Sequence, residues 1–155
     1  MLWLTQAAPL ALSAAETLHV NPFCVLAQWA VETGWGQYPV WTLQHNPGGV
    51  TGAGGPLEFA DLQYGIKAYV ASMMADCPII RNHQSTPTMT AEVYMAGDVY
   101  NTVNKGYARL VDVVAAQIEH MQPQLFSPPA KGSTTAIITN VVIDGKVTKN
   151  STIWL

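Results

Sequence analysis

The amino-acid sequence predicts a mainly α-helical fold of the α+β class, with a small β-region inside the helical domain and a β-hairpin at the C-terminal end. Three observations predict it. Apolar residues recur at helical spacing in several segments, residues 34–56 are rich in glycine and proline, and residues 136–155 are rich in valine, isoleucine and threonine. We therefore expect a helical domain over residues 1–122, a Pro/Gly-rich linker over residues 123–134 and a hairpin appendage over residues 135–155.

The N-terminal segment is apolar enough to suggest a secretory signal peptide. It lacks the positively charged start of such a peptide, however, and Gln6 and Pro9 interrupt its apolar run. We therefore predict a first helix over residues 9–18, with Pro9 in its first turn, in place of a cleaved leader.

The second helix has clear signals at both ends. Asn21 can cap the N-terminus, and Pro22 suits the first helical position. Residues 22–33 are apolar nearly all round, which indicates a helix buried in the middle of a domain. Gly34 and Gly36 end it. The glycine- and proline-rich residues that follow are predicted to form loops or short strands.

Three further helices follow the glycine-rich segment. They are predicted over residues 62–74 after an N-cap at Asp61, residues 90–96 before Gly97, and residues 107–121 before Pro123. The expected buried faces are Leu62, Ile66, Tyr69, Val70 and Met73 in the first of these, and Leu110, Val113, Val114, Ile118 and Met121 in the last.

The C-terminal residues carry a hairpin signal. Asp144-Gly145 lies between two β-prone runs, which is typical of a type I′ turn. A two-stranded hairpin alone is marginal in water, so residues 135–155 are expected to pack on their own domain or to extend a sheet in a partner or second copy. The second alternative predicts assembly into a virion or a homo-oligomer.

Charge is scarce: 10 acidic and 7 basic residues among 155, with a formal net charge of −3. This weakly acidic composition does not favour nucleic-acid binding, and no apolar run is long enough to span a membrane.

Cys24 and Cys77 are too few for a disulfide framework, so buried thiols are expected, with a disulfide between them as the alternative. The four histidines show no metal-ligand spacing, and we expect neither metal nor cofactor.

Glu32 lies in the last turn of the most apolar helix, on the same face as Gln28 and Trp29. Lost hydration and the helix C-terminus should both raise its pKa. A carboxylic acid that keeps its proton near neutral pH is what glycosidic cleavage requires, since the departing sugar oxygen must be protonated. On position alone, a glutamate that turns to solvent is an equal alternative.

The residues around Glu32 read Ala-Gln-Trp-Ala-Val-Glu-Thr-Gly-Trp-Gly from Ala27 to Gly36. This segment resembles the signature of the glucosaminidase-type peptidoglycan hydrolases, the group of bacterial autolysins and the flagellar rod-associated wall hydrolase. Weaker likenesses follow in the family's order: Asn46-Pro47-Gly48-Gly49-Val50, residues 59–71, and Thr102 to Ala108. The resemblance covers residues 7–121.

The resemblance implies a lysozyme-like fold in which the β-region forms one wall of a cleft. It implies that Glu32 is the catalytic acid and that Tyr107 lines the cleft. Two departures stand out. Asn104 replaces the aspartate of the family's Thr-Asp-Pro, and the segment that often carries a second acidic residue is short and holds only Glu58.

Three kinds of chemistry are compatible with these residues. Glu58 can act as a base, the substrate's 2-acetamido group can act as the nucleophile, or a sugar hydroxyl can do so in a lytic transglycosylase. The expected catalytic residues are Glu32, Tyr107 and Glu58. The expected substrate-binding residues are Trp35, Tyr38, Asn46, Tyr100 and Asn104, with Trp41 as a further aromatic that can stack on sugars.

The sequence therefore predicts a glycosidase of peptidoglycan that cleaves the β-1,4 bond between N-acetylglucosamine and N-acetylmuramic acid. We expect it to act at the bacterial cell wall, as a virion-associated phage enzyme or as an endolysin released by a separate route. The competing hypothesis is a wall-binding or structural virion component with weak or no catalysis, which Asn104 and the short β-region favour.

Overall fold

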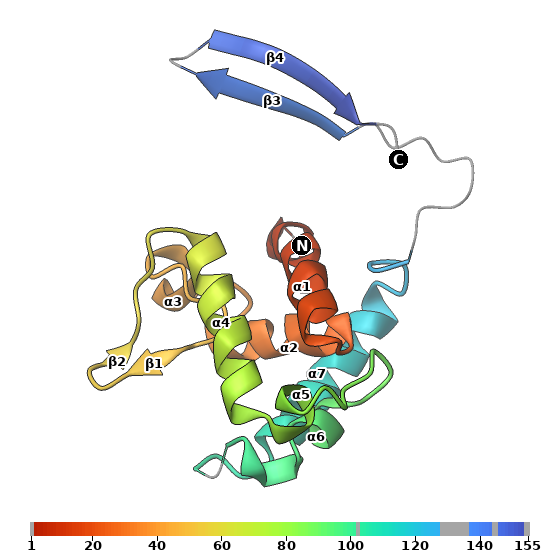
Figure 1. The fold of residues 1–155 in the computed structure, drawn as a ribbon. Coiled ribbons are helices and arrows are strands. Elements are labelled where there is room, and N and C mark those ends of the chain that lie inside the picture. Colours follow the sequence, from red (N-terminus) through yellow and green to blue (C-terminus); the bar gives the residue numbers. More distant parts are fainter. Residues whose placement is uncertain (1, 102, 128–136, 144–145, 154–155) are drawn as a thin grey trace.

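The computed structural model describes residues 2–101, 103–127, 137–143 and 146–153, and only the backbone of Asp98 and of the C-terminal strands. It is mostly helical with a small antiparallel sheet, so the predicted fold class is confirmed (Figure 1). The helices are α1 (Leu2–Leu18), α2 (Pro22–Thr33), α3 (Pro39–Thr42), α4 (Leu62–Asp76), α5 (Pro78–Arg81), α6 (Ala91–Tyr94) and α7 (Tyr107–Met121), with a 3₁₀ turn at Gly97–Val99.

Helix α2 runs through the middle of the helical body, packed against α1 and α7 (Figure 1). Its boundaries match the prediction. The Asn21 side chain accepts a hydrogen bond from the Phe23 N–H, Pro22 occupies the first turn, and Gly34 ends the helix with φ +55°. Every residue from 23 to 30 is buried, so this helix forms the centre of the core.

Helix α1 begins earlier than predicted, at Leu2, and it carries Pro9 in its interior. A proline inside a helix costs about 3 kcal/mol, which is why Pro9 was expected in the first turn. The small side chains of Ala7, Ala8 and Ala11 are buried, and they let α1 pack closely on α2. The burial of this alanine face offsets the cost of the proline, whose own ring is exposed.

Helix α4 begins as predicted, because the Asp61 side chain accepts a hydrogen bond from the Tyr64 N–H at 3.0 Å. It continues two residues beyond the predicted end, to Asp76. Gly65 lies against the preceding loop, where a Cβ atom would overlap the carbonyl oxygen of His45. The predicted face is confirmed: Ile66, Tyr69 and Met73 are buried, and Leu62 and Val70 pack at the edge of the core.

Helix α6 is shorter than the predicted 90–96. It ends at Tyr94, Ala96 takes a left-handed conformation with φ +53°, and Gly97 begins a 3₁₀ turn where it was expected to end the helix. The chain therefore turns twice before Tyr100, and that residue faces α2 through its bond to Gln28.

Helix α7 has the predicted bounds, but its predicted buried face is confirmed only in part: Ile118 is buried and Val114 packs at the edge of the core. Leu110, Val113 and Met121 are each about half exposed. The buried residues of this helix are Tyr107, Ala108, Val111, Ala115 and Ile118. The large aliphatic side chains suggested the wrong face, because small alanines face α2 where the two helices pack closely.

The β-region is a two-residue antiparallel ladder, β1 (Thr51–Gly52) with β2 (Gly55–Pro56), which projects as an arm beside α4 (Figure 1). The short helices α3 and α5 lie in stretches for which no helix was predicted. Each starts at a proline, Pro39 and Pro78, whose fixed φ suits a first helical turn.

The C-terminal strands β3 (Ile137–Ile143) and β4 (Lys146–Ile153) pair antiparallel, with a register shift between Val141 and Val142, as the hairpin prediction requires. Asp144-Gly145 and residues 128–134 of the predicted linker lie outside the described residues. The domain boundaries remain a prediction.

Cys24 and Cys77 are free thiols, both buried. Burial raises the pKa of each to about 12, and the Asp112 carboxylate beside Cys24 also raises the pKa of that thiol.

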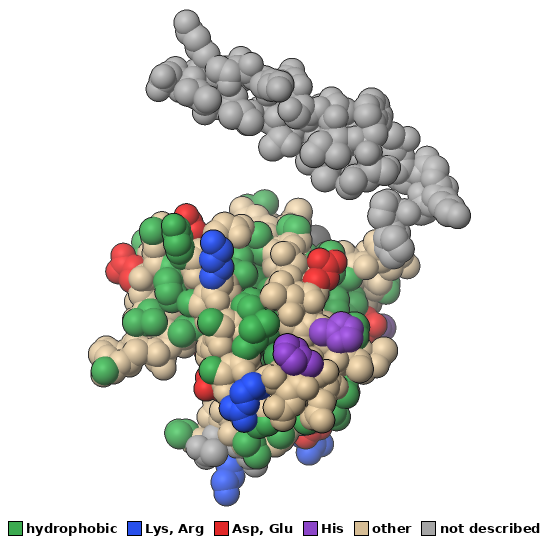
Figure 2. Space-filling model, viewed as in Figure 1, with side chains coloured by type: hydrophobic (Ala, Val, Ile, Leu, Met, Phe, Trp, Pro, Cys, Tyr) green, Lys and Arg blue, Asp and Glu red, His purple; other side chains and the backbone are tan. Residues whose placement is uncertain are grey.

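In the described part of the chain, no helix is both long and apolar enough to cross a bilayer. On the face drawn in Figure 2, charged side chains are scattered among apolar and uncharged polar ones.

Candidate active site

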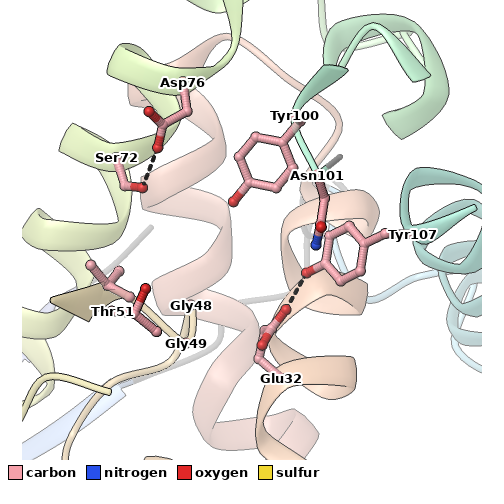
Figure 3. Close-up of a pocket in the computed structure, with 10 residues that line it drawn as sticks. Glu32, Gly48, Gly49, Thr51, Ser72, Asp76, Tyr100, Asn101 and Tyr107 are labelled. Atoms are coloured by element: carbon pink, nitrogen blue, oxygen red, sulfur yellow. Dashed lines mark hydrogen bonds between the residues drawn. The ribbon is translucent and has the colours of Figure 1, made fainter. Parts of the chain in front are cut away.

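A cavity of about 340 Å³ lies between α2, α4, the start of β1 and the chain from Tyr100 to Tyr107. Figure 3 shows the side chains that point into it, and they come from segments far apart in the sequence. Its lining is mainly polar. The lining residues are Glu32, Gly48, Gly49, Val50, Thr51, Ser72, Asp76, Tyr100, Asn101 and Tyr107.

Glu32 projects into this cavity from the last turn of α2, on the side where α7 begins (Figure 3). Burial raises the pKa of its carboxyl group. The hydroxyl of Tyr107 donates a hydrogen bond to Oε1, and this bond lowers the pKa but does not cancel the effect of burial. The predicted direction of the shift is therefore confirmed, and desolvation is its main cause.

The loop before β1 passes directly over the Glu32 carboxylate. A Cβ atom on Gly49 would lie 2.5 Å from Oε2, and Gly49 has φ +61°, a conformation that residues with a side chain rarely adopt. Glycine at this position therefore lets the backbone approach the acid while leaving Oε2 uncovered by a side chain.

Tyr100 and Tyr107 form the wall on the same side as Glu32. Their ring centroids are 6.1 Å apart with an interplanar angle of 33°. Burial raises the pKa of both hydroxyl groups, that of Tyr100 to about 12, and Glu32 raises that of Tyr107 further. Both phenols therefore keep their protons at any pH near neutrality, so they can serve as hydrogen-bond donors.

The opposite wall carries a second carboxylate, which the sequence analysis missed. Asp76 ends α4, and the Ser72 hydroxyl one turn earlier donates to its Oδ2 at 2.9 Å (Figure 3). The sequence contained an indication of this pair, because Ser72 and Asp76 are four residues apart, a spacing that places both side chains on one face of a helix. Asn101 also lines the cavity, and its Oδ1 accepts a hydrogen bond from the Asn104 N–H at 2.9 Å.

A family model described as glucosaminidase, mannosyl-glycoprotein endo-beta-N-acetylglucosaminidase, matches residues 8–131. The chain belongs to this family. The match covers most of the 155 residues and includes every residue that lines the cavity. Comparisons with curated proteins and with solved structures gave no match. The family match shows a glycoside hydrolase that acts on peptidoglycan, and the predicted family and enzyme class are confirmed.

Five predicted site residues do not line the cavity: Glu58, Asn104, Tyr38, Trp35 and Asn46. Glu58 and Asn104 are exposed outside it, and the Asn104 carbonyl accepts the first backbone bond of α7, from Tyr107. Tyr38 is 56% exposed, and its ring covers Gly34 at the end of α2.

Trp35 is 37% exposed and packs edge-on against Trp3, with ring centroids 6.0 Å apart. Trp41, the further aromatic candidate, is buried between Trp3 and Trp29. The tryptophans that follow the acid therefore contribute to a cluster around the N-terminal helix, and the structure does not bring them to the cavity.

Asn46 is fully buried, and the structure gives it a different setting from the one expected. Its Nδ2 donates to the carbonyls of Val50 and Leu57, and its Oδ1 accepts from the Val50 N–H. Both amide protons are used within the protein. Asn46 thus fixes the loop that covers Glu32 and ties it to Leu57, the residue after β2, and it offers no donor to an acetamido group in this arrangement.

Among the described residues, no cluster of three or more His, Cys, Asp or Glu side chains is arranged to hold a metal ion. Two of the histidines have other partners. His19 Nδ1 bonds the Ser85 carbonyl at 2.7 Å, and His45 Nδ1 bonds the Phe59 carbonyl at 2.9 Å.

Proposed function

We propose that this glycoside hydrolase cleaves the β-1,4 bond between N-acetylglucosamine and N-acetylmuramic acid, with Glu32 as the general acid. The observation that carries the proposal is a carboxyl group whose pKa is raised by burial and which faces a polar cavity. Such a group stays protonated at a pH where exposed carboxyls are ionised, so it can protonate the departing sugar oxygen.

The contacts of Glu32 indicate which oxygen delivers the proton. Because the Tyr107 hydroxyl donates to Oε1, a protonated Glu32 carries its hydrogen on Oε2. That atom lies beside Gly49, which has no side chain to cover it. After proton transfer the carboxylate is negative, and the bond from Tyr107 stabilises that charge.

The second role, attack on the anomeric carbon, falls to the substrate's own 2-acetamido group. Glu58 was the predicted second carboxylate, but it lies outside the cavity. Asp76 lies in it, and the Ser72 proton is used in the bond to Asp76, so the pair presents acceptors to the substrate. We assign this pair to binding sugar hydroxyl or amide protons. A lytic transglycosylase that uses a sugar hydroxyl as nucleophile is the alternative reaction.

The roles of Asp76 and Glu58 can be separated by two matched substitutions that remove a charge. Asp76→Asn is expected to lower kcat/KM on soluble glycan strands by about tenfold, since it weakens an acceptor site in the cavity. Glu58→Gln is expected to change it by less than about twofold. The release of reducing ends measures both. A larger loss from Glu58→Gln than from Asp76→Asn would restore Glu58 as the second carboxylate.

The products of digestion test the bond and the reaction together. We expect muropeptides that end in reducing N-acetylglucosamine, identified by mass spectrometry after borohydride reduction. A reducing N-acetylmuramic acid end would show cleavage of the other bond of the glycan strand. An anhydro-N-acetylmuramic acid end would show the transglycosylase reaction and overturn the assignment of hydrolysis.

A further inference from the structure

A chain of buried polar groups lies behind the cavity and is not used by the proposed mechanism. Gln28 is on α2, one turn before Glu32, and it is fully buried. The hydroxyl of Tyr69, on α4, donates to Gln28 Oε1 at 2.8 Å, and Gln28 Nε2 donates to the Tyr100 hydroxyl oxygen at 3.2 Å. The chain thus connects α4 to the wall of the cavity through the helix that carries Glu32.

The direction of these hydrogen bonds is fixed by a fourth side chain. Gln28 Nε2 also lies 3.8 Å from the sulfur of Met73, which has lone pairs but no proton to donate. Turning the amide round would place Oε1 against that sulfur, with two acceptors facing each other. Gln28 therefore presents its oxygen to Tyr69 and its N–H groups to Met73 and Tyr100.

The direction of the Gln28 hydrogen bonds determines whether the Tyr100 hydroxyl can act as a donor in the cavity. A phenol has one proton, and the oxygen of Tyr100 already receives a hydrogen bond from Gln28. Its own O–H must therefore point away from Gln28, and Tyr100 lines the cavity (Figure 3). The raised pKa of this phenol, about 12, keeps the proton in place at neutral pH.

We propose that Gln28 is a positioning residue that directs the Tyr100 hydroxyl proton into the cavity, where Tyr100 binds the carbonyl oxygen of a substrate N-acetyl group. A carbonyl oxygen can only accept, so it requires a donor with a fixed direction. A sugar hydroxyl can rotate to suit either a donor or an acceptor. The buried chain therefore selects N-acetylated sugars. The inference rests on the proposed function, since it concerns the same cavity and substrate class.

The test uses soluble glycan strands from peptidoglycan and the same strands after chemical N-deacetylation. The measured quantity is the affinity for acetylated strands divided by that for deacetylated strands, determined by binding to the Glu32→Gln protein, because cleavage itself requires the 2-acetamido group. Adding Tyr100→Phe to this protein is expected to lower the ratio about tenfold or more, mainly by weakening the binding of acetylated strands, since a site built to bond a polar group loses discrimination when that bond is removed. An equal loss of affinity for both kinds of strand would overturn the assignment of Tyr100.

Gln28 is tested by its coupling to Tyr100. Gln28→Met keeps the side-chain length, and combining it with Tyr69→Phe avoids an unpaired buried hydroxyl. This double variant is expected to lower the affinity ratio when Tyr100 is present and to have no further effect when Tyr100 is replaced by phenylalanine. If the double variant lowers the ratio by the same factor whether Tyr100 is present or replaced, Gln28 does not act through Tyr100 and its positioning role is wrong. Tyr69→Phe alone is the matched control and should preserve the ratio, because Gln28 can still donate to Tyr100.

Thermal unfolding of each variant verifies that the compared proteins are folded at the assay temperature. Different results would contradict the proposed function and the role of Tyr100. If the wild type does not cleave acetylated strands, or Glu32→Gln still does, the proposed function is wrong. If the wild type cleaves them and Tyr100→Phe leaves the affinity ratio unchanged, only the present inference is wrong.

Discussion

Glu32→Gln is expected to lower the rate of glycan cleavage by about three orders of magnitude, the typical contribution of a positioned general acid. Glutamine has nearly the shape of glutamic acid, and its Oε1 can still accept the hydrogen bond that the Tyr107 hydroxyl donates to Glu32. The variant therefore keeps the cavity and loses the proton that the leaving sugar oxygen needs. The release of reducing ends from soluble glycan strands measures the loss.

The control for this substitution is Glu58→Gln, which makes the same chemical change on an exposed residue outside the cavity. It should retain activity close to that of the wild type. A folded, pure Glu32→Gln protein that lyses cell walls at the wild-type rate would contradict the assignment of the acid. Binding of glycan strands by the inactive variant would show that substrate recognition is intact.

Tyr107→Phe is expected to have the second largest effect, both on the rate and on its dependence on pH. The Tyr107 hydroxyl stabilises the charged form of Glu32, so its bond lowers the pKa of the acid. Without the hydroxyl the charged form is less favourable, and the pKa of Glu32 rises further above its ordinary value. Activity is lost when Glu32 is deprotonated, so the alkaline limb of the pH profile moves to higher pH.

At the optimum pH, the rate of Tyr107→Phe should fall by about tenfold or more, because the carboxylate formed by proton transfer lacks its charge-assisted hydrogen bond. Kinetics of kcat/KM as a function of pH measure both effects. The matched control is Tyr38→Phe, since Tyr38 is largely exposed and does not line the cavity. An alkaline limb that stays in place or moves to lower pH would exclude Tyr107 as the partner that tunes the acid.

The parts of the fold that were predictable from the sequence are those with local causes. The start and end of α2 follow from Asn21, Pro22 and Gly34, which act within a few residues of their own position. The start of α4 follows in the same way from Asp61. The interior position of Pro9 in α1 was not predicted and the buried face of α7 was predicted only in part, because the close packing of alanines against α2 decided both.

In the candidate site, too, the residues with a local signal in the sequence were expected, and those placed by packing between distant segments were not. Glu32 was expected at the site because the segment from Ala27 to Gly36 resembles the family's signature, whereas its place in an apolar helix left a solvent-facing glutamate as an equal alternative. Tyr107 was expected there because it also lies in a segment that resembles the family. Asp76 was missed, since only the packing of α4 opposite α2 brings it to the cavity. Asn46 was expected at the substrate and instead holds the loop, since both its amide protons bond carbonyls that lie 4 and 11 residues away in sequence.

The two buried cysteines make the molecule convenient to label. A thiol reacts as its thiolate, and a pKa of about 12 leaves Cys24 and Cys77 almost entirely protonated at neutral pH and shielded from reagents. A new cysteine at exposed Ala53, in the turn between β1 and β2, can therefore carry a fluorescent dye while the native thiols stay unmodified. The dye would sit on the arm beside the cavity and report the arrival of a glycan strand directly.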